Sequence, residues 1–204
     1  AKRLEYVRRG ALMRSKLKTI HRLLSRLMLT GAKPSFDGIP GGLGRDLLIL
    51  EYGNPKSLEI LRRKAGGLAA VLVEPVQSRV PELQPREFLR NLREITARHG
   101  TALIFDEMIS GFRVAQGGAQ EHFGVKADIA TYGKLAGGGL PLSLIAGSRR
   151  FLDRVDGGAW RFGDGTGPDV PTTFFAGTHC RHPLSLTAAL AMAKILTQEG
   201  PNLQ

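Results

Sequence analysis

The chain has 204 residues, of which 42% are hydrophobic and 23% are charged, a composition that allows a sizeable core and excludes wholesale disorder. No apolar run approaches the roughly 18 residues that a membrane-spanning helix needs, so we expect no membrane span. Cys180 is the only cysteine, which excludes an internal disulfide and a Cys-rich zinc site. A lone cysteine suits a reducing compartment, and the sequence therefore favours the cytoplasm.

The net charge of +11 is concentrated near the N-terminus. Residues 1–33 hold ten Lys or Arg against one acid, whereas the other residues hold 19 bases and 17 acids. Apolar residues recur there every three or four positions and predict a basic amphipathic helix: Met13, Leu17, Ile20, Leu24, Leu27 and Met28. Such a helix can bind an anionic membrane surface or a partner, serve as a transit-like leader, or pack on the body. We therefore divide the chain into a basic arm, residues 1–34, and a body, residues 35–204.

The body alternates strands and helices from residue 69 onward. Residues 69–75 form an apolar run typical of a strand buried on both faces. Residues 85–100 predict a helix that ends at Gly100 and has one apolar stripe, consisting of Phe88, Leu89, Leu92 and Ile95. Further strands are expected at 101–105, 128–131 and 142–146, a loop at 155–171, and a helix at 183–196. This order predicts an α/β fold with a mostly parallel sheet flanked by helices.

Two acids are expected at one edge of this sheet. Glu74 and Asp106 follow parallel strands, whose carboxyl ends are where open α/β sheets bind ligands. Lys134 precedes Gly137–Gly139, and a partly desolvated lysine on a glycine-rich turn can act as an imine-forming nucleophile. An acid opposite it could hold a protonated ring nitrogen, and these are the parts that pyridoxal phosphate (PLP) requires. Taken singly, such a lysine is more often a solvated loop charge, and such an Asp is more often a helix cap.

Other site chemistries find no support in the sequence. The glycines match neither G-x-x-x-x-G-K-[ST] nor G-x-G-x-x-G, which argues against a nucleotide loop. No G-x-S-x-G motif is present, and the histidines lack the spacing of metal ligands, so we expect no metal site.

A long segment resembles a known family. The run LIFDEMISGFRVAQGGAQEHFGVKADIATYGKLAGGGLP, residues 103–141, closely resembles class III aminotransferases, which are PLP enzymes of fold type I. It is most similar to glutamate-1-semialdehyde aminomutase-like members. VEPVQSRVPELQPREFL (73–89) and FFAGTHCRHPLSL (174–186) extend the resemblance, which covers about residues 35–198. The phrase VQSRVPELQPREFL looks most like aminotransferase domains embedded in polyketide and non-ribosomal peptide synthetases.

The resemblance implies roles for five residues. Lys134, in TYGKLAGGG, matches the lysine that holds PLP as an internal aldimine and later shuttles protons. Asp106, in FDE, matches the partner of the pyridinium nitrogen, and Met108 matches the apolar residue packed against the ring. Thr178 matches a threonine that reaches the cofactor phosphate of the neighbouring subunit, and Glu74 matches a glutamate near the site. The implied activity is amino-group transfer between a small-molecule amino donor and a carbonyl acceptor in a homodimer, as a transaminase or as an intramolecular aminomutase.

Part of the family pattern is missing. Family members are longer and have a large and a small domain, so residues 35–204 are expected to be a fragment, the central part of the PLP-binding large domain. An aromatic-His-Gly motif is expected where the sequence reads GAKPSFDG, residues 31–38. We hypothesise that residues 1–33 are translated out of frame or joined from elsewhere, which re-reading the coding DNA in the other two frames tests.

Two alternative functions remain open. One is a catalytically inactive fragment of the same fold, retained as an interaction surface. The other makes the basic arm the functional part, binding nucleic acid or an anionic membrane, although the nearly balanced charge of the body makes nucleic acid the less favoured partner. Steeply salt-dependent binding that disappears when residues 1–33 are deleted would indicate the second alternative.

Overall fold

The computed structural model describes residues 47–203 and divides the chain into two compact units between Ala69 and Ala70. The basic arm, residues 1–34, lies outside the described residues, so its helix and its boundary stay predictions. The described part of the first unit contains α2 (Pro55–Lys64) and the 3-10 turn η2 (Ala65–Gly67). Asn54 begins α2 by accepting a hydrogen bond from the Lys56 N–H at 2.9 Å, and Pro55 occupies the first helical position, where no N–H is needed.

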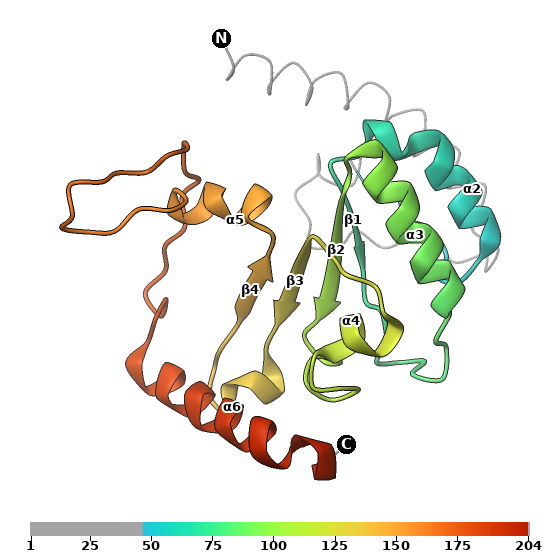
Figure 1. The fold of residues 1–204 in the computed structure, drawn as a ribbon. Coiled ribbons are helices and arrows are strands. Elements are labelled where there is room, and N and C mark those ends of the chain that lie inside the picture. The colour runs from blue at the N-terminus through green and yellow to red at the C-terminus, as the bar shows by residue number, and fades with distance from the viewer. Residues whose placement is uncertain (1–46, 204) are drawn as a thin grey trace. The chain divides into compact units, whose positions relative to one another are not determined.

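The second unit is built on a sheet whose strand order within the described residues is β1-β2-β3-β4. Its strands are β1 (Ala70–Val73), β2 (Ala102–Glu107), β3 (Ile129–Tyr132) and β4 (Leu144–Gly147). The first three strands are parallel and β4 runs antiparallel to β3, as the arrowheads in Figure 1 show. The predicted α/β class and the mostly parallel sheet are therefore confirmed.

Two helices of this unit, α3 (Arg86–His99) and α6 (Pro183–Leu203), fall close to the predicted ranges. The sequence did not predict the helices α4 (Gly118–Phe123) and α5 (Arg149–Asp156) or the 3-10 turn η3 (Lys134–Gly137). The end of α3 at Gly100 is confirmed: Gly100 has a φ of +68°, the left-handed conformation that glycine adopts without strain. The last helix extends further than the predicted 183–196.

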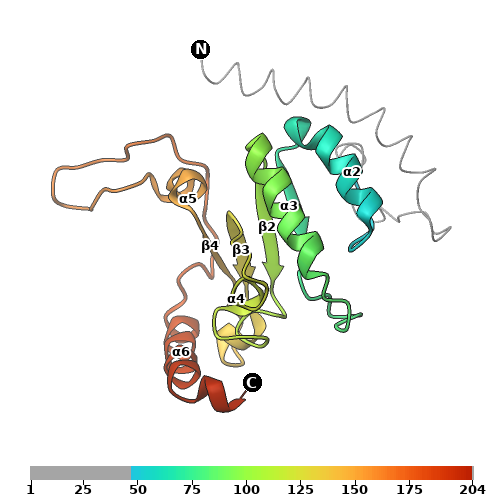
Figure 2. The same cartoon turned by 45° about the vertical axis from the view of Figure 1, so that its right-hand side comes forward.

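The core lies between α3, α4 and one face of the sheet (Figure 2). The predicted stripe of α3 is buried, as are Leu103 and Phe105 of β2 and Phe123 of α4. Leu103 and Phe105 are two positions apart and therefore point to the same face. Burial of each such side chain contributes about 1.5–3 kcal/mol, so this layer positions the strands.

The opposite face of the sheet is more open than predicted. Residues 69–75 were expected to form a strand buried on both faces, but β1 lies at the edge of the sheet formed by the described residues, and Leu72 is 67% exposed. Leu72 pairs with Ile104 and so lies on the face away from Leu103 and Phe105. Ile145 of β4, on the same open face, is 54% exposed. The expectation was wrong because an apolar run alone does not reveal which face a helix layer covers.

Across residues 47–203, the structure contains no helix long and apolar enough to span a membrane.

Candidate functional site

The carboxyl ends of β2 and β3 bring Asp106 and Thr131 together. The two residues are directly paired across the strands, and Asp106 Oδ1 accepts a hydrogen bond from the Thr131 hydroxyl at 3.3 Å. The same oxygen accepts the Met108 N–H at 3.1 Å. Both bonds involve Oδ1, so among residues 47–203 the half-buried carboxylate keeps Oδ2 available for a cationic or N–H ligand.

Lys134 begins the turn that follows β3. Its φ of +46° is uncommon for a residue with a side chain and directs the lysine off the strand axis at the start of η3. The expected partial desolvation is not observed, because the Lys134 side chain is exposed in the structure. Among the described helices and strands, α6 is the main neighbour of η3.

Met108 lies against the residue that precedes this lysine. A Cβ on Gly133 would stand 3.0 Å from Met108 Sδ and 3.2 Å from the carbonyl oxygen of Leu142, so a larger residue at position 133 would displace Met108. The structure thereby places Asp106, Met108 and the start of η3 at one edge of the sheet. The roles that the family resemblance implies for these residues remain proposals.

The glycines after Lys134 allow a close approach between η3 and α6. Gly138 has a φ of +58°, and a Cβ there would lie 3.2 Å from the carbonyl oxygen of Ala188. The amide Nε2 of Gln116 donates a 2.9 Å hydrogen bond to the Leu196 carbonyl and ties α6 to the loop after β2. Helix α6 therefore packs against η3, the turn that begins at Lys134, and lies below it in Figure 1.

The other two predicted residues lie apart from this group. Glu74 follows β1 at the same edge of the sheet, and its Oε1 accepts the Ser78 N–H at 3.0 Å in its own turn rather than contacting Asp106. Thr178 is exposed in the irregular segment between α5 and α6. No hydrogen bond between described residues joins it to the other four.

Sequence reasoning assigned no role to Glu107, which is only 1% exposed. Its Oε2 accepts the Ala119 N–H at 2.6 Å, and its Oε1 accepts Nε2 of Gln120 at 3.2 Å. Burial raises the pKa of this carboxyl, and the hydrogen bonds from α4 partly oppose that effect. Strand alternation offers a signal: of two adjacent acids in a strand, one must point toward the covered face.

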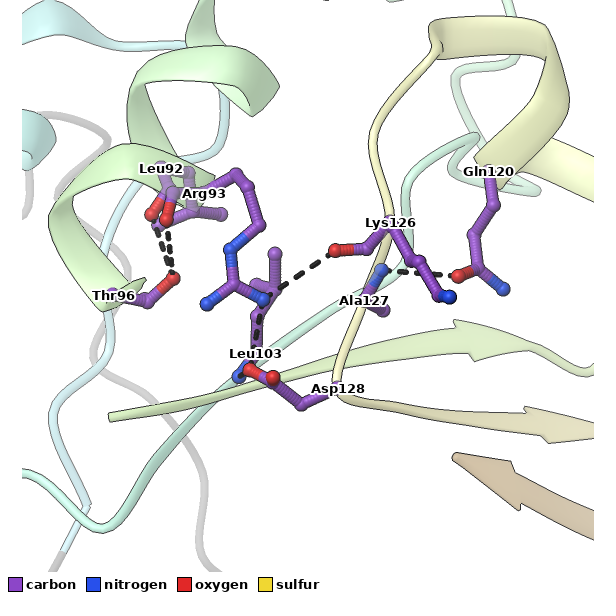
Figure 3. A network of polar contacts seen from close by, with 8 residues as sticks. All are labelled: Leu92, Arg93, Thr96, Leu103, Gln120, Lys126, Ala127 and Asp128. Carbon is purple, nitrogen blue, oxygen red and sulfur yellow. Dashed lines mark hydrogen bonds and ion pairs between the residues drawn. The ribbon is translucent and has the colours of Figure 1, made fainter. Parts of the chain in front are cut away.

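A second polar network lies at the opposite edge of the sheet (Figure 3). Arg93 of α3 forms an ion pair with Asp128, which precedes β3, with Nη1 2.8 Å from Oδ2. The same carboxylate oxygen accepts the Leu103 N–H at 2.8 Å, and Nη1 also donates to the Lys126 carbonyl at 3.4 Å. This network fixes the beginnings of β2 and β3 to α3.

The described residues contain no group of three or more His, Cys, Asp or Glu that could hold a metal ion.

The sequence and the fold correspond to one protein family. The model of the aminotransferase class-III family matches residues 52–203, so the chain belongs to that family. Glutamate-1-semialdehyde 2,1-aminomutase of Chlorobium luteolum is 38% identical over 177 residues, covering 85% of this chain and 38% of that protein. The same enzyme of Hyperthermus butylicus is 37% identical over 172 residues, covering 82% of this chain and 37% of that protein.

Solved structures show the same relationship. A transaminase with PLP bound has a TM-score of 0.70 and 33% identity, covering 82% of this chain and 38% of that chain. An omega-transaminase from Sphaerobacter thermophilus has a TM-score of 0.68 and 31% identity, covering 81% of this chain and 36% of that chain. The chain thus spans less than two fifths of the length of the proteins that it matches here.

Proposed function

We propose that the chain is the PLP-binding segment of an enzyme that transfers amino groups. The observation that carries this proposal is the placement of Asp106, held by the Thr131 hydroxyl and the Met108 N–H, beside the strand that leads into Lys134. A carboxylate oxygen suits a protonated ring nitrogen, and a primary amine suits the PLP aldehyde, so the donor set fits the group. PLP supplies an electron sink for the carbon that carries the amino group.

The chain's own residues have distinct parts in this proposal. Lys134 would hold PLP covalently through Nζ and would then carry a proton to or from the substrate carbon that bears the amino group. Asp106 keeps the ring nitrogen protonated, which a neutral residue at that position would not do. Met108 packs against one face of the ring, in the position that Gly133 leaves open for it. Glu74 contributes a carboxylate at the same edge, beyond the end of β1.

Two reactions are consistent with the proposal. A transaminase moves the amino group from a donor, whose carbon becomes a carbonyl, to the carbonyl carbon of an acceptor. An aminomutase exchanges the amino group and the carbonyl oxygen between two carbons of one molecule. The aminomutase relatives support the second reaction and the transaminase structures support the first. Consumption of glutamate 1-semialdehyde without an added donor would indicate the second.

A second copy of this chain is the partner that we propose. Exposed apolar side chains gather on α6 and the segment before it: Leu184 (62%), Leu190 (59%), Phe174 (91%) and Phe175 (57%). Covering them requires another surface, and Thr178 stands on the same segment, from which it would reach the cofactor phosphate of the second copy. Leu190→Arg is expected to shift the mass measured by light scattering from dimer to monomer.

A cytoplasmic location is also part of the proposal, supported by the exposed free thiol of Cys180.

Cofactor capture tests the proposed function. The chain is incubated with PLP, reduced with borohydride, and analysed by peptide mass spectrometry. We expect the label on Lys134 and its loss in Lys134→Ala. Lys126→Ala removes another exposed lysine and should leave the label in place. Absence of label, or label scattered over many lysines, would overturn the proposal for this chain and favour the inactive fragment.

A further inference from the structure

A partly buried polar bridge joins the last residues of β2 and β3. Glu107 and Tyr132 are directly paired and point to the covered face of the sheet. The amide Nε2 of Gln120, on α4, donates to Glu107 Oε1 at 3.2 Å and to the Tyr132 hydroxyl at 2.9 Å. Its Oε1 accepts the Ala127 N–H at 3.0 Å. One glutamine side chain therefore contacts both strand ends and the segment that enters β3.

Two glycines provide the space for this bridge. A Cβ at Gly111 would stand 2.6 Å from Cδ1 of Tyr132, and a Cβ at Gly118 would collide with the Glu107 carboxylate. Burial, and then the nearby Glu107 carboxylate, raise the pKa of Tyr132, so its hydroxyl stays protonated. A partly buried bridge whose groups are paired in this way permits few alternative arrangements of the elements that it joins.

The bridge is adjacent in sequence to the candidate cofactor site. Asp106 directly precedes Glu107, and Lys134 follows Tyr132 after one residue, Gly133. We infer that Glu107 is a positioning residue: through Gln120 it fixes the end of β3 relative to β2, and with it the spacing between Asp106 and Lys134. This inference rests on the proposed function, because that spacing is the one that the cofactor ring and its aldehyde would have to bridge.

Reversing the polarity of the bridge provides a specific test. In Glu107→Gln the size is kept, but both Glu107 oxygens are acceptors, so the new amide N–H group has to face either Nε2 of Gln120 or the Ala119 N–H, and two donors cannot bond to each other. The double variant Glu107→Gln/Gln120→Glu restores the pairing, because the new carboxylate at position 120 can accept from the new amide, the Tyr132 hydroxyl and the Ala127 N–H. Asp128→Asn serves as a matched control at the other edge of the sheet.

The first readout is amide hydrogen exchange of the full, cofactor-free chain, followed by mass spectrometry. We expect Glu107→Gln to accelerate exchange in peptides covering residues 129–137 by about tenfold, and the double variant to return it to within about twofold of wild type. Asp128→Asn should accelerate exchange near residues 93–103 and leave residues 133–137 unchanged. Unchanged exchange at 129–137 in Glu107→Gln would overturn the inference, as would failure of the double variant to restore it.

The second readout uses the chain loaded with PLP. The visible circular dichroism of PLP is measured before reduction. It is then divided by the amount of label found on Lys134 after reduction, and the ratio reports how firmly the ring is oriented. It should fall at least about threefold in Glu107→Gln, since orientation is lost with the bridge, and recover in the double variant. A wild-type chain that takes no label would refute the proposed function, whereas the exchange measurement would still decide the inference. If Glu107→Gln does not fold, folding of the double variant with wild-type exchange supports the inference, and failure of both overturns it.

Discussion

The two edges of the sheet each carry an aspartate that contacts the adjacent strand, but the two carboxylates are used differently. At the amino edge, Asp128 pairs with Arg93 and accepts the Leu103 N–H, so its charge is neutralised within the fold. At the carboxyl edge, Asp106 accepts only hydrogen bonds, and none of the ion pairs among the described residues includes it. The comparison suggests that the amino edge supplies stability, while the carboxyl edge keeps charge available for a ligand.

Removing the amino-edge carboxylate should have the largest effect on stability. Asp128→Ala leaves the partly buried Arg93 guanidinium and the Leu103 N–H without their acceptor, and we expect a loss of about 2–3 kcal/mol in the free energy of unfolding. Asp106→Ala is the matched variant at the other edge and should cost about 1 kcal/mol. Urea unfolding measures both values. Equal costs would show that the two edges do not differ as described.

The second prediction compares two glycines at the ends of α4. Gly118 (φ +69°) and Gly124 (φ +66°) have nearly the same backbone conformation, but only at Gly118 would a Cβ meet the Glu107 carboxylate. Gly124→Ala should cost about 1 kcal/mol from backbone strain, and Gly118→Ala about 2 kcal/mol or more because the buried carboxylate must also move. Thermal or urea unfolding gives the difference. A difference near zero would mean that the carboxylate relocates freely.

The third prediction concerns the pH dependence of stability. Because burial raises the pKa of Glu107, the folded chain binds this proton more tightly than the unfolded chain. The resulting stabilisation is fully present at pH values below the ordinary glutamate range and is lost as the pH rises through the raised pKa. Urea unfolding of Glu107→Gln across this range should therefore give a flatter pH profile. Thr96→Val, which changes a buried uncharged side chain of α3, should shift the whole profile without changing its slope.

The smallest effect is expected at Gly133. Its backbone is extended, so Gly133→Ala adds no strain of that kind, and the new methyl group displaces mainly the flexible end of Met108. We expect a cost of about 0.5–1 kcal/mol in unfolding free energy. The double variant Gly133→Ala/Met108→Ala should be more stable than the sum of the single variants predicts, since the clash is removed. Strict additivity would show that Met108 and Gly133 are not in contact.

The elements were easier to predict from the sequence than the burial of individual groups. The α3 stripe and Gly100 followed from helical spacing and from the preference of glycine for a left-handed end, and both depend on local chain properties. The open face of β1 and the exposure of Lys134 depend on which elements pack nearby, which periodicity does not encode. Glu107 was missed for a related reason, because its bonds to Ala119 and Gln120 join residues of two elements.

The reversed direction of β4 determines how the chain reaches Thr178. Since β4 ends at the amino edge, where the Ser148 N–H bonds to the Asp128 carbonyl at 2.9 Å, the chain must return along the height of the sheet to begin α6. Residues 158–168 form a side loop closed by the 2.8 Å bond from the Asp169 N–H to the Gly157 carbonyl. Because the two ends of this loop meet, its residues do not contribute to the distance that the chain covers between β4 and α6. Insertions there should leave Thr178 in place, whereas a change of one residue between 174 and 182, after the 2.6 Å bond from the Thr173 N–H to the Arg154 carbonyl, would move it along the path.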